Sequence, residues 1–481
     1  MLNRKLLEVL QRLSEPERKR LRLFLASPFF NGSYAADDIL RLYDLILRCG
    51  ADEAHPDLDK DAVFPLFFPN RPSSGKAKSP LDSLSSELFR LVRQFLNFMD
   101  QEAEQTPARE SLAMARFYRK HALDKRFWQT LQAARKNQEE MPYRDAQYYL
   151  DQFRIEGEEL AFRGMHNAFE DDINLNSSEE NLDFHYSIQK LEYACALEYQ
   201  KQHAQIERTS SNELTSTVLR LSVENGPLDI PINRMYHLVI HLMQNKEQGP
   251  TLHDLEELLS NNKTKVEPEK YKNLQAYFRF LWLQKYYKSG DDFSRKRLFD
   301  IYKEHLDEGY FYLEGLIPLT AFRNIAIFAL KLGEFDWVKN FLDTHPPERI
   351  GGTHYPVEIH SLNLAEYYFY QKQYEEAQHS LVYRMFENPG FSILADLLLV
   401  KIYFETQSDL LESRMKALDQ KVRRSKRSRA FKNRYYNFLK KLDKIIKYGT
   451  LHRHPKRQKL FEEIKSTPEI ASREWLLEKL K

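Results

Sequence analysis

The sequence predicts an all-α protein: an N-terminal helical module followed by an irregular α-solenoid of helix hairpins. Nearly every segment carries apolar residues at helical spacing, and none shows a convincing alternating strand pattern. Glycine is scarce, at 15 of 481 residues, which argues against a turn-rich β protein and against an enzyme with many glycine loops. Beyond residue 107, helices of roughly 12–25 residues alternate with short breaks, as stacked helix pairs do.

The N-terminal module is assigned to residues 1–104. Ser14 and Glu17 form a capping box that begins a helix, and the stretch "ASPFFNGS" ends it. The next helix ends at Gly50, a residue suited to the left-handed conformation that follows many helices. Asp59 begins a short helix, and "SPLDSLSSELFRLVRQFLNFMDQE" is the last and longest helix of the module.

Residues 105–265 are predicted to form an array of helical hairpins. The breaks between its helices are expected at Pro142 and in the stretches 174–181, 224–231 and 245–250, which read "NLNSSEEN", "ENGPLDIP" and "NKEQGP". Proline, glycine and short polar residues of this kind interrupt helices and favour turns.

Residues 266–420 contain an internal repeat of helix pairs. In "NIAIFALKLGEFDWVKNFLDTHPP" one helix runs to Gly333, and Phe335 opens the next. In "SLNLAEYYFYQKQYEEAQHSLVYRMFENP" the repeat positions are small, aromatic or proline, namely Ala365, Tyr368, Tyr374, Ala377 and Pro389. We expect the small residues to let two helices approach closely, the aromatic residues to fill the groove between hairpins, and the proline to end the second helix.

Over roughly residues 270–420 this spacing resembles the tetratricopeptide-repeat family, although Val338 stands where that pattern has a small residue. The resemblance implies a solenoid that binds partner proteins on a concave face, and it implies no catalytic residues. The N-terminal stretches "FLASPFFN", "FPLFFPN" and "LDSLSSELFRLVRQFL" resemble a family of uncharacterised bacterial helical proteins. That second resemblance implies no function.

Positive charge is concentrated in a basic C-terminal helical section, residues 421–481. Residues 421–460 hold 16 Lys or Arg and one acid, and this net charge of +15 leaves −13 for the rest of a chain whose total is +2. On a helical wheel, the apolar residues of 431–447 fall within about 120° and the cations occupy the remainder. The patch predicted to bind a partner consists of Arg423, Arg424, Lys426, Arg427, Arg429, Arg434, Lys440, Lys441 and Lys444.

Three interpretations of the outward face of this section are open. It is a solvated helix face, a contact for an acidic protein surface (including another copy's acidic body), or a sequence-independent contact for nucleic-acid phosphates. The final helix, in "SREWLLEKLK", is expected to cap the array with Trp475 and Leu476 turned inward.

No residue pattern predicts a catalytic, cofactor-binding or metal site. His237 and His241 lie four apart, but a metalloprotease would have Glu after the first His, and Leu238 is there instead. Other weak candidates are the pair Glu376 and His379, the pair His452 and His454, and the stretch "GGTHYP", which we interpret as an inter-repeat loop. The aromatic clusters "YYFYQKQY" and "LWLQKYY" are interpreted as core.

The sequence therefore favours a non-enzymatic scaffold or adaptor that binds partner proteins. The alternative is a nucleic-acid-binding or regulatory protein that uses the basic face, and an enzyme site assembled from distant helices stays open. The two cysteines, Cys49 and Cys195, fit buried apolar positions in a reducing compartment. We predict no signal peptide, no membrane span and no cofactor, and hence a cytoplasmic location.

Overall fold

The computed structural model of the chain is all-α, as predicted, with 23 α-helices in the part that it describes. It describes residues 3–32, 35–69, 80–166, 175–204, 213–224, 230–244, 251–382, 384–448 and 455–480. The chain divides into two compact units. Unit 1 comprises Met1–Met141 and Ala146–His185, and unit 2 comprises Pro142–Asp145 and Tyr186–Lys481.

The N-terminal half of unit 1 has its own hydrophobic core, which includes Leu21, Tyr43 and Leu88. Its helices are α1 (Arg4–Arg12), α2 (Glu15–Ala26), α3 (Ala36–Arg48), α4 (Lys60–Phe67) and α5 (Pro80–Ala103), with a 3-10 turn at Pro56–Leu58. The predicted capping box is confirmed, because the backbone N–H of Ser14 donates to the Glu17 carboxylate at 2.7 Å. Residues 70–79, between α4 and α5, lie outside the described residues.

The second half of unit 1 contains α6 (Pro107–Lys120), α7 (Asp124–Glu139), α8 (Ala146–Met165) and the start of α9 (Leu175–Ala204). The predicted break at 174–181 is wrong, since α9 begins at Leu175 and includes most of that stretch. Its side chains bond within the helix, as Asn181 does by donating to the Ser177 carbonyl at 2.7 Å. Short polar residues are common both in turns and at helix starts, so composition does not separate the two.

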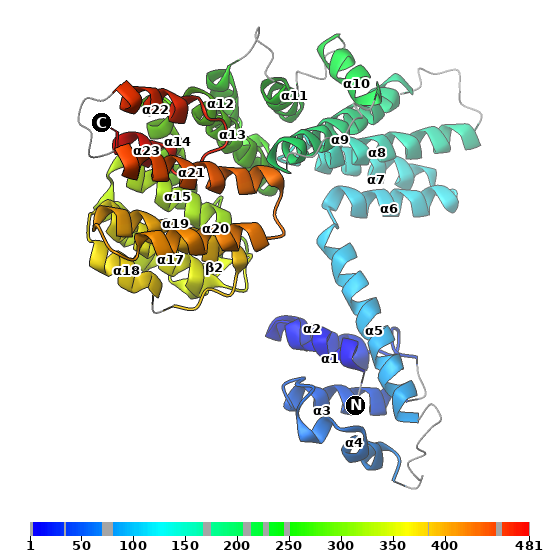
Figure 1. Cartoon of the computed structure of the whole chain (residues 1–481). Coiled ribbons are helices and arrows are strands. Elements are labelled where there is room, and N and C mark those ends of the chain that lie inside the picture. The colour runs from blue at the N-terminus through cyan, green and yellow to red at the C-terminus, as the bar shows by residue number, and fades with distance from the viewer. Residues whose placement is uncertain are drawn as a thin grey trace. The chain divides into compact units, whose positions relative to one another are not determined.

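Unit 2 continues along α9 and then consists of shorter helices (Figure 1). They are α10 (Glu213–Glu224), α11 (Pro231–Met243), α12 (Leu252–Asn261), α13 (Pro268–Ser289), α14 (Asp292–Asp307), α15 (Leu319–Leu332), α16 (Phe335–Thr344), α17 (Pro356–Tyr370), α18 (Tyr374–Val382), α19 (Pro389–Glu405), α20 (Leu411–Arg424), α21 (Arg429–Tyr448), α22 (Pro455–Ser466) and α23 (Arg473–Glu478).

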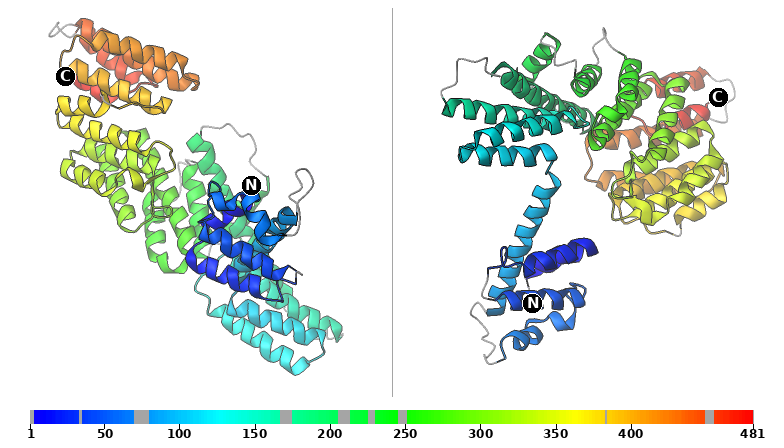
Figure 2. Two further views of the ribbon diagram at one scale, coloured as in Figure 1. Left: turned by 90° about the horizontal axis from the view of Figure 1, so that it is seen from below. Right: turned by 180° about the vertical axis from the view of Figure 1, so that it is seen from behind.

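Helices α13 to α20 form four consecutive hairpins in chain order. Each A helix (α13, α15, α17, α19) packs on the B helix that follows it, and the B helices α14, α16 and α18 also pack on the next A helix. The A helices α15, α17 and α19 pack in sequence as well, and the two views of Figure 2 show these hairpins side by side. Contacts between sequence neighbours of this kind are compatible with a helical solenoid.

Each of these hairpins turns at a residue with a left-handed backbone. The residues are Gly290 (φ 65°), Gly333 (φ 79°), Lys372 (φ 61°) and Gln407 (φ 52°), and Ala122 (φ 53°) does the same between α6 and α7. At Lys372 the backbone N–H bonds to the Phe369 carbonyl, and the next N–H bonds to the Tyr368 carbonyl. This is the Schellman pattern, which satisfies the last carbonyls of a helix and reverses the chain.

The repeat residues occupy the hairpins as follows. Ala365 and Ala377 are fully buried in α17 and α18, whose close packing they permit, and Val338 is fully buried in α16 in the place of a small residue. The predicted role of Pro389 is wrong. Helix α18 already ends at Val382, and Pro389 is the first residue of α19, where Asn388 caps the helix. Proline suits that position because the first turn has no partner for its missing N–H.

The loops before α15 and α17 are joined by two short strands that the sequence did not predict. Strand β1 (Ile317–Pro318) pairs in parallel with β2 (Ile350–Gly351), with Ile317 and Ile350 both buried. The "GGTHYP" stretch runs from β2 to the first residue of α17, so it belongs to the connection between the hairpins α15–α16 and α17–α18. A Cβ at Gly351 would stand 3.0 Å from the Leu316 Cβ, so the close approach of the two loops favours glycine there.

Three of the predicted domain boundaries can be placed on this architecture. The boundary after residue 104 falls between α5 and α6, and the boundary after residue 265 falls just before α13. The boundary after residue 420 lies inside α20, so the basic section begins within the last hairpin. The assignment of the four ranges as domains remains a prediction.

Replacing Lys372 by Gly tests the hairpin turns. Lys372 is exposed and left-handed, so Lys372→Gly is expected to stabilise unit 2 by about 0.5–1 kcal/mol in urea unfolding. Gly333→Ala, where a Cβ would meet no atom within 4 Å, should cost about 1 kcal/mol through its backbone alone. The control Gln371→Gly lies at φ −81° and should destabilise. A destabilising Lys372→Gly would contradict this account of the turns.

Candidate interaction surfaces

Helix α21 buries the apolar stripe that the sequence predicted for it. Tyr435, Phe438, Leu442 and Ile445 are buried, whereas Ile446 at the edge of the stripe is 42% exposed. Figure 1 shows α21 in orange beside the red helices α22 and α23, on which it packs. The basic residues of this region are therefore carried by a helix that is fixed to a core.

Two residues of the predicted cationic patch do not face solvent freely. Lys441 is only 5% exposed and forms an ion pair with Glu463 of α22. The Lys444 ammonium lies 3.0 Å from the same carboxylate. Hydrogen bonds from Lys441 and then Lys444 lower the pKa of Glu463. The wheel of α21 placed Lys441 among the outward cations, because it contained no information about an acid on another helix.

The other patch residues are exposed. Arg423 pairs with Asp419 at 2.8 Å, within α20. Among the described residues no acid partner pairs with the remaining cations, which are Arg424, Lys426, Arg427, Arg429, Arg434 and Lys440. Four of these, Arg424, Lys426, Arg427 and Arg429, lie where α20 ends and α21 begins, and we call them the cationic turn.

The electrostatics of the cationic turn favour an anionic partner. Arginine at the end of α20 offsets the negative end of that helix dipole, but Arg429 lies at the positive end of α21 and adds to it. The guanidinium of Arg427 lies 5.7 Å from the centre of the Phe431 ring, which fixes one cation over an aromatic face.

A second surface lies where the four A helices end. Tyr286 of α13, Lys331 of α15, Tyr370 of α17 and the neighbours Phe404 and Glu405 of α19 all belong to the last turns of their helices. We call these five residues the A-helix edge. Burial raises the pKa of Tyr370, and the carboxylates of Glu366, Glu474 and Glu478 raise it further. Two of those carboxylates belong to α23, so the terminal helix lies against this edge.

Behind the edge, charged residues link three successive A helices. Arg323 of α15 lies 3.7 Å from the Glu366 carboxylate of α17, and Lys401 of α19 lies 4.0 Å from it on the other side. The Lys401 ammonium also stands 4.2 Å from the centre of the Phe369 ring. Burial lowers the pKa of Lys401, and the Glu366 carboxylate acts in the opposite direction. This charged row fixes how neighbouring A helices are aligned.

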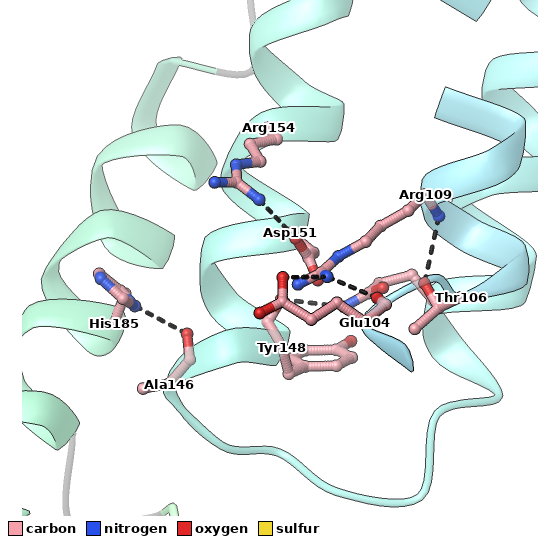
Figure 3. Close-up of polar contacts among 9 residues, drawn as sticks. Glu104, Thr106, Arg109, Ala146, Tyr148, Asp151, Arg154 and His185 are labelled. Carbon is pink, nitrogen blue, oxygen red and sulfur yellow. Dashed lines mark hydrogen bonds and ion pairs between the residues drawn. The ribbon is translucent and has the colours of Figure 1, made fainter. Parts of the chain in front are cut away.

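Unit 1 contains a different charged network, which the sequence did not reveal. Figure 3 shows the buried carboxylate of Asp151 on α8 accepting hydrogen bonds from Arg109 at 2.9 Å and from Arg154 at 3.1 Å. The backbone N–H of Arg109 is in turn bonded to Thr106, which caps α6. Farther along α8, buried Glu158 accepts from Arg116 at 2.7 Å and from Arg119 at 2.9 Å.

The network extends to α7 through Arg135, which bonds to both Glu156 and Glu159. Burial favours the neutral acid at Glu159, but hydrogen bonds from Arg135 and Arg163 outweigh it and lower the pKa of Glu159. The inward face of α8 is thus acidic, and arginines of α6 and α7 neutralise it. Since charges buried without partners are costly, these pairs hold α6, α7 and α8 in one register.

The residues that the sequence offered as weak candidates for a catalytic or metal site do not come together in space in the described structure. His237 and His241 are half-buried in α11, and Glu376 and His379 lie on α18, while His452 and His454 lie outside the described residues. Both cysteines are buried.

One potential metal-ligand group occurs among the described residues. Cys49, His55 and Asp57 offer ligand atoms within 4.8 Å of one another. The Nδ1 of His55 already accepts the backbone N–H of Asp57 at 3.3 Å, and burial raises the pKa of the Cys49 thiol. Both facts favour a turn cap and an inert thiol over a metal centre.

Among the helices that the structure describes, none has the length and hydropathy needed to cross a membrane. No family model, no curated protein and no solved structure matches the chain. The two family resemblances of the sequence therefore remain predictions.

Replacing Glu158 by Gln tests the network of unit 1. Glu158→Gln keeps the shape of the side chain but removes the charge that neutralises Arg116 and Arg119, so we expect α6 to α8 to lose about 2 kcal/mol of protection in hydrogen exchange. Glu110 is exposed on α6, and the control Glu110→Gln should change protection by less than about 0.5 kcal/mol. Equal protection in the two variants would show that the network is energetically neutral.

Proposed function

We propose that the protein is a non-enzymatic scaffold or adaptor that binds partner proteins through its stacked hairpins. One observation carries this proposal. Residues of the A-helix edge from α13, α15 and α19 all contact the one helix α23, so a single helix at this edge touches several hairpins at once. The resemblance to tetratricopeptide repeats implies partner binding on a concave face, so it supports a protein-binding role in general.

The chemistry of the surface supports recognition over catalysis. Glu366 is neutralised by Arg323 and Lys401, and Glu405 by Lys479 of the chain itself. Carboxylates held in ion pairs are poor general bases, because their lone pairs are already engaged by a cation. The two buried free cysteines support our proposal that the protein acts in the cytoplasm.

Site-specific photo-crosslinking in cells tests the scaffold proposal. Tyr287 is 72% exposed at the end of α13, and Phe293 is 70% exposed on the B helix of the same hairpin. A photoreactive phenylalanine analogue in place of Tyr287 is expected to give a discrete crosslinked partner, because this position adjoins the A-helix edge. The same analogue in place of Phe293 is the matched control and should give none. Identical products from both positions, or none from Tyr287, would contradict the proposal.

Nucleic-acid binding by the cationic turn is a second candidate function. It is favoured by four exposed cations that have no acid partner among the described residues and that lie beside the positive end of α21. Contacts of this kind bind phosphates without reading the sequence, and their affinity falls steeply with salt.

Fluorescence anisotropy with duplex DNA and with RNA, over a salt series, tests this second candidate. If phosphates bind here, reversing the four cations of the cationic turn to Glu should weaken binding at least about tenfold and flatten the salt dependence. The charge-matched control reverses four exposed lysines of unit 1, Lys5, Lys120, Lys125 and Lys136. Absence of binding at low salt, or equal losses in the two variants, would exclude the cationic turn as the site.

A further inference from the structure

The terminal helix α23 contacts more of the chain than a capping helix needs to. In a solenoid each repeat touches only its neighbours, so a cap is expected to contact the last hairpin alone. Helix α23 packs on α21 and α22, but its side chains also reach α13, α15 and α19. It therefore lies across the A-helix edge and touches hairpins that are far apart in the sequence.

The contacts at the α15 end are polar. The Glu474 carboxylate lies 2.9 Å from the Lys331 ammonium and accepts a hydrogen bond from the Tyr286 hydroxyl at 3.4 Å. The side chain of Glu474 is still 56% exposed. Because exposed ion pairs contribute little to stability, this part of the interface exchanges readily with another carboxylate.

The contacts at the α19 end surround Glu405. Its carboxylate accepts the indole N–H of Trp475 at 2.6 Å and pairs with the Lys479 ammonium at 2.5 Å. The Trp475 ring packs edge-on against Phe404, with centroids 5.3 Å apart. Trp475 is thus the apolar anchor, and one acid of the edge recognises both an indole and an ammonium.

The backbone at the start of α23 is strained. Ser472, the residue before the helix, has φ 48° and makes no side-chain cap. A left-handed backbone is costly for a residue that has a Cβ. The turn that leads into α23 therefore carries this backbone cost while α23 is docked.

We propose that the A-helix edge binds a partner's helix and that α23 occupies this site as an internal competitor, an inference that rests on the scaffold function proposed above. The edge selects the chemistry of the ligand. Lys331 requires a carboxylate, Phe404 and Glu405 require a large aromatic residue with an N–H donor, and Glu405 also accepts a cation. The partner helix therefore presents an acidic residue followed directly by tryptophan, with a lysine about one turn farther on, as Glu474, Trp475 and Lys479 do.

Binding of a labelled peptide in trans tests this proposal on the full chain. The probe has the sequence of residues 470–480, "IASREWLLEKL". The variant Glu474→Lys weakens the internal competitor without removing buried side chains, so the peptide should bind it at least tenfold more tightly than it binds the wild type. The variant Glu462→Lys, on an exposed site of α22, makes the same change in charge and should keep the wild-type affinity. Equal affinity in wild type and Glu474→Lys would overturn the proposal.

A charge swap separates docking from a general loss of structure. Lys331→Glu should weaken peptide binding several-fold, because it places two carboxylates against each other, and the double variant Lys331→Glu with Glu474→Lys should restore the wild-type hydrogen-exchange protection of residues 473–478. Unchanged peptide affinity in Lys331→Glu would show that the peptide does not bind at the A-helix edge.

Glu474→Lys could instead form a dimer, at rising protein concentration, in which two copies exchange α23. That outcome would make a second copy of this chain the ligand, and it would contradict the proposal of a partner's helix. If Tyr287 crosslinks to a partner but the peptide does not bind, only the proposal that α23 competes for this site is rejected. If the peptide binds but no partner is crosslinked, only the scaffold function is rejected.

Discussion

The left-handed residue at the tip of each hairpin is the constraint on which the array of unit 2 depends. At Gly333 and Lys372 it ends the A helix at a fixed residue and returns the chain so that the B helix packs alongside. Because every A helix ends in this way, the last turns of α13, α15, α17 and α19 come to the same side. The last turns of these helices form the A-helix edge, across which α23 lies through its own side-chain contacts.

Charge pairs supply the alignment that apolar packing leaves open. The hydrophobic effect is non-directional, so directional ion pairs add to the register that side-chain packing sets. In unit 2 the row of Arg323, Glu366 and Lys401 performs this role across three A helices. In unit 1 the acidic face of α8 meets arginines of α6 and α7. Both networks use acids that composition alone assigns to the surface.

The sequence predicted the features that depend on one helix at a time. The all-α class, the capping box at Ser14, the end of a helix at Gly333 and the buried stripe of α21 all follow from local periodicity or capping. Features that need a second helix were missed or misread. The sequence of α21 alone places Lys441 on the surface, whereas in the structure it pairs with Glu463 of α22. The sequence of α8 alone likewise suggests that Glu158 is exposed, whereas two arginines of α6 bind it. The repeat spacing predicted a hairpin between Tyr368 and Tyr374, but it did not predict the left-handed residue of the turn, because Lys372 is not glycine.

The pairing of β1 with β2 has a mechanical consequence for the array. It joins the loop before α15 to the loop before α17 through backbone hydrogen bonds, with Ile317 and Ile350 buried at the joint. The hairpins α15–α16 and α17–α18 are thereby clamped together, whereas no such strand pair joins the other described hairpins. Relative displacement of these two hairpins therefore has to break backbone hydrogen bonds as well as side-chain contacts.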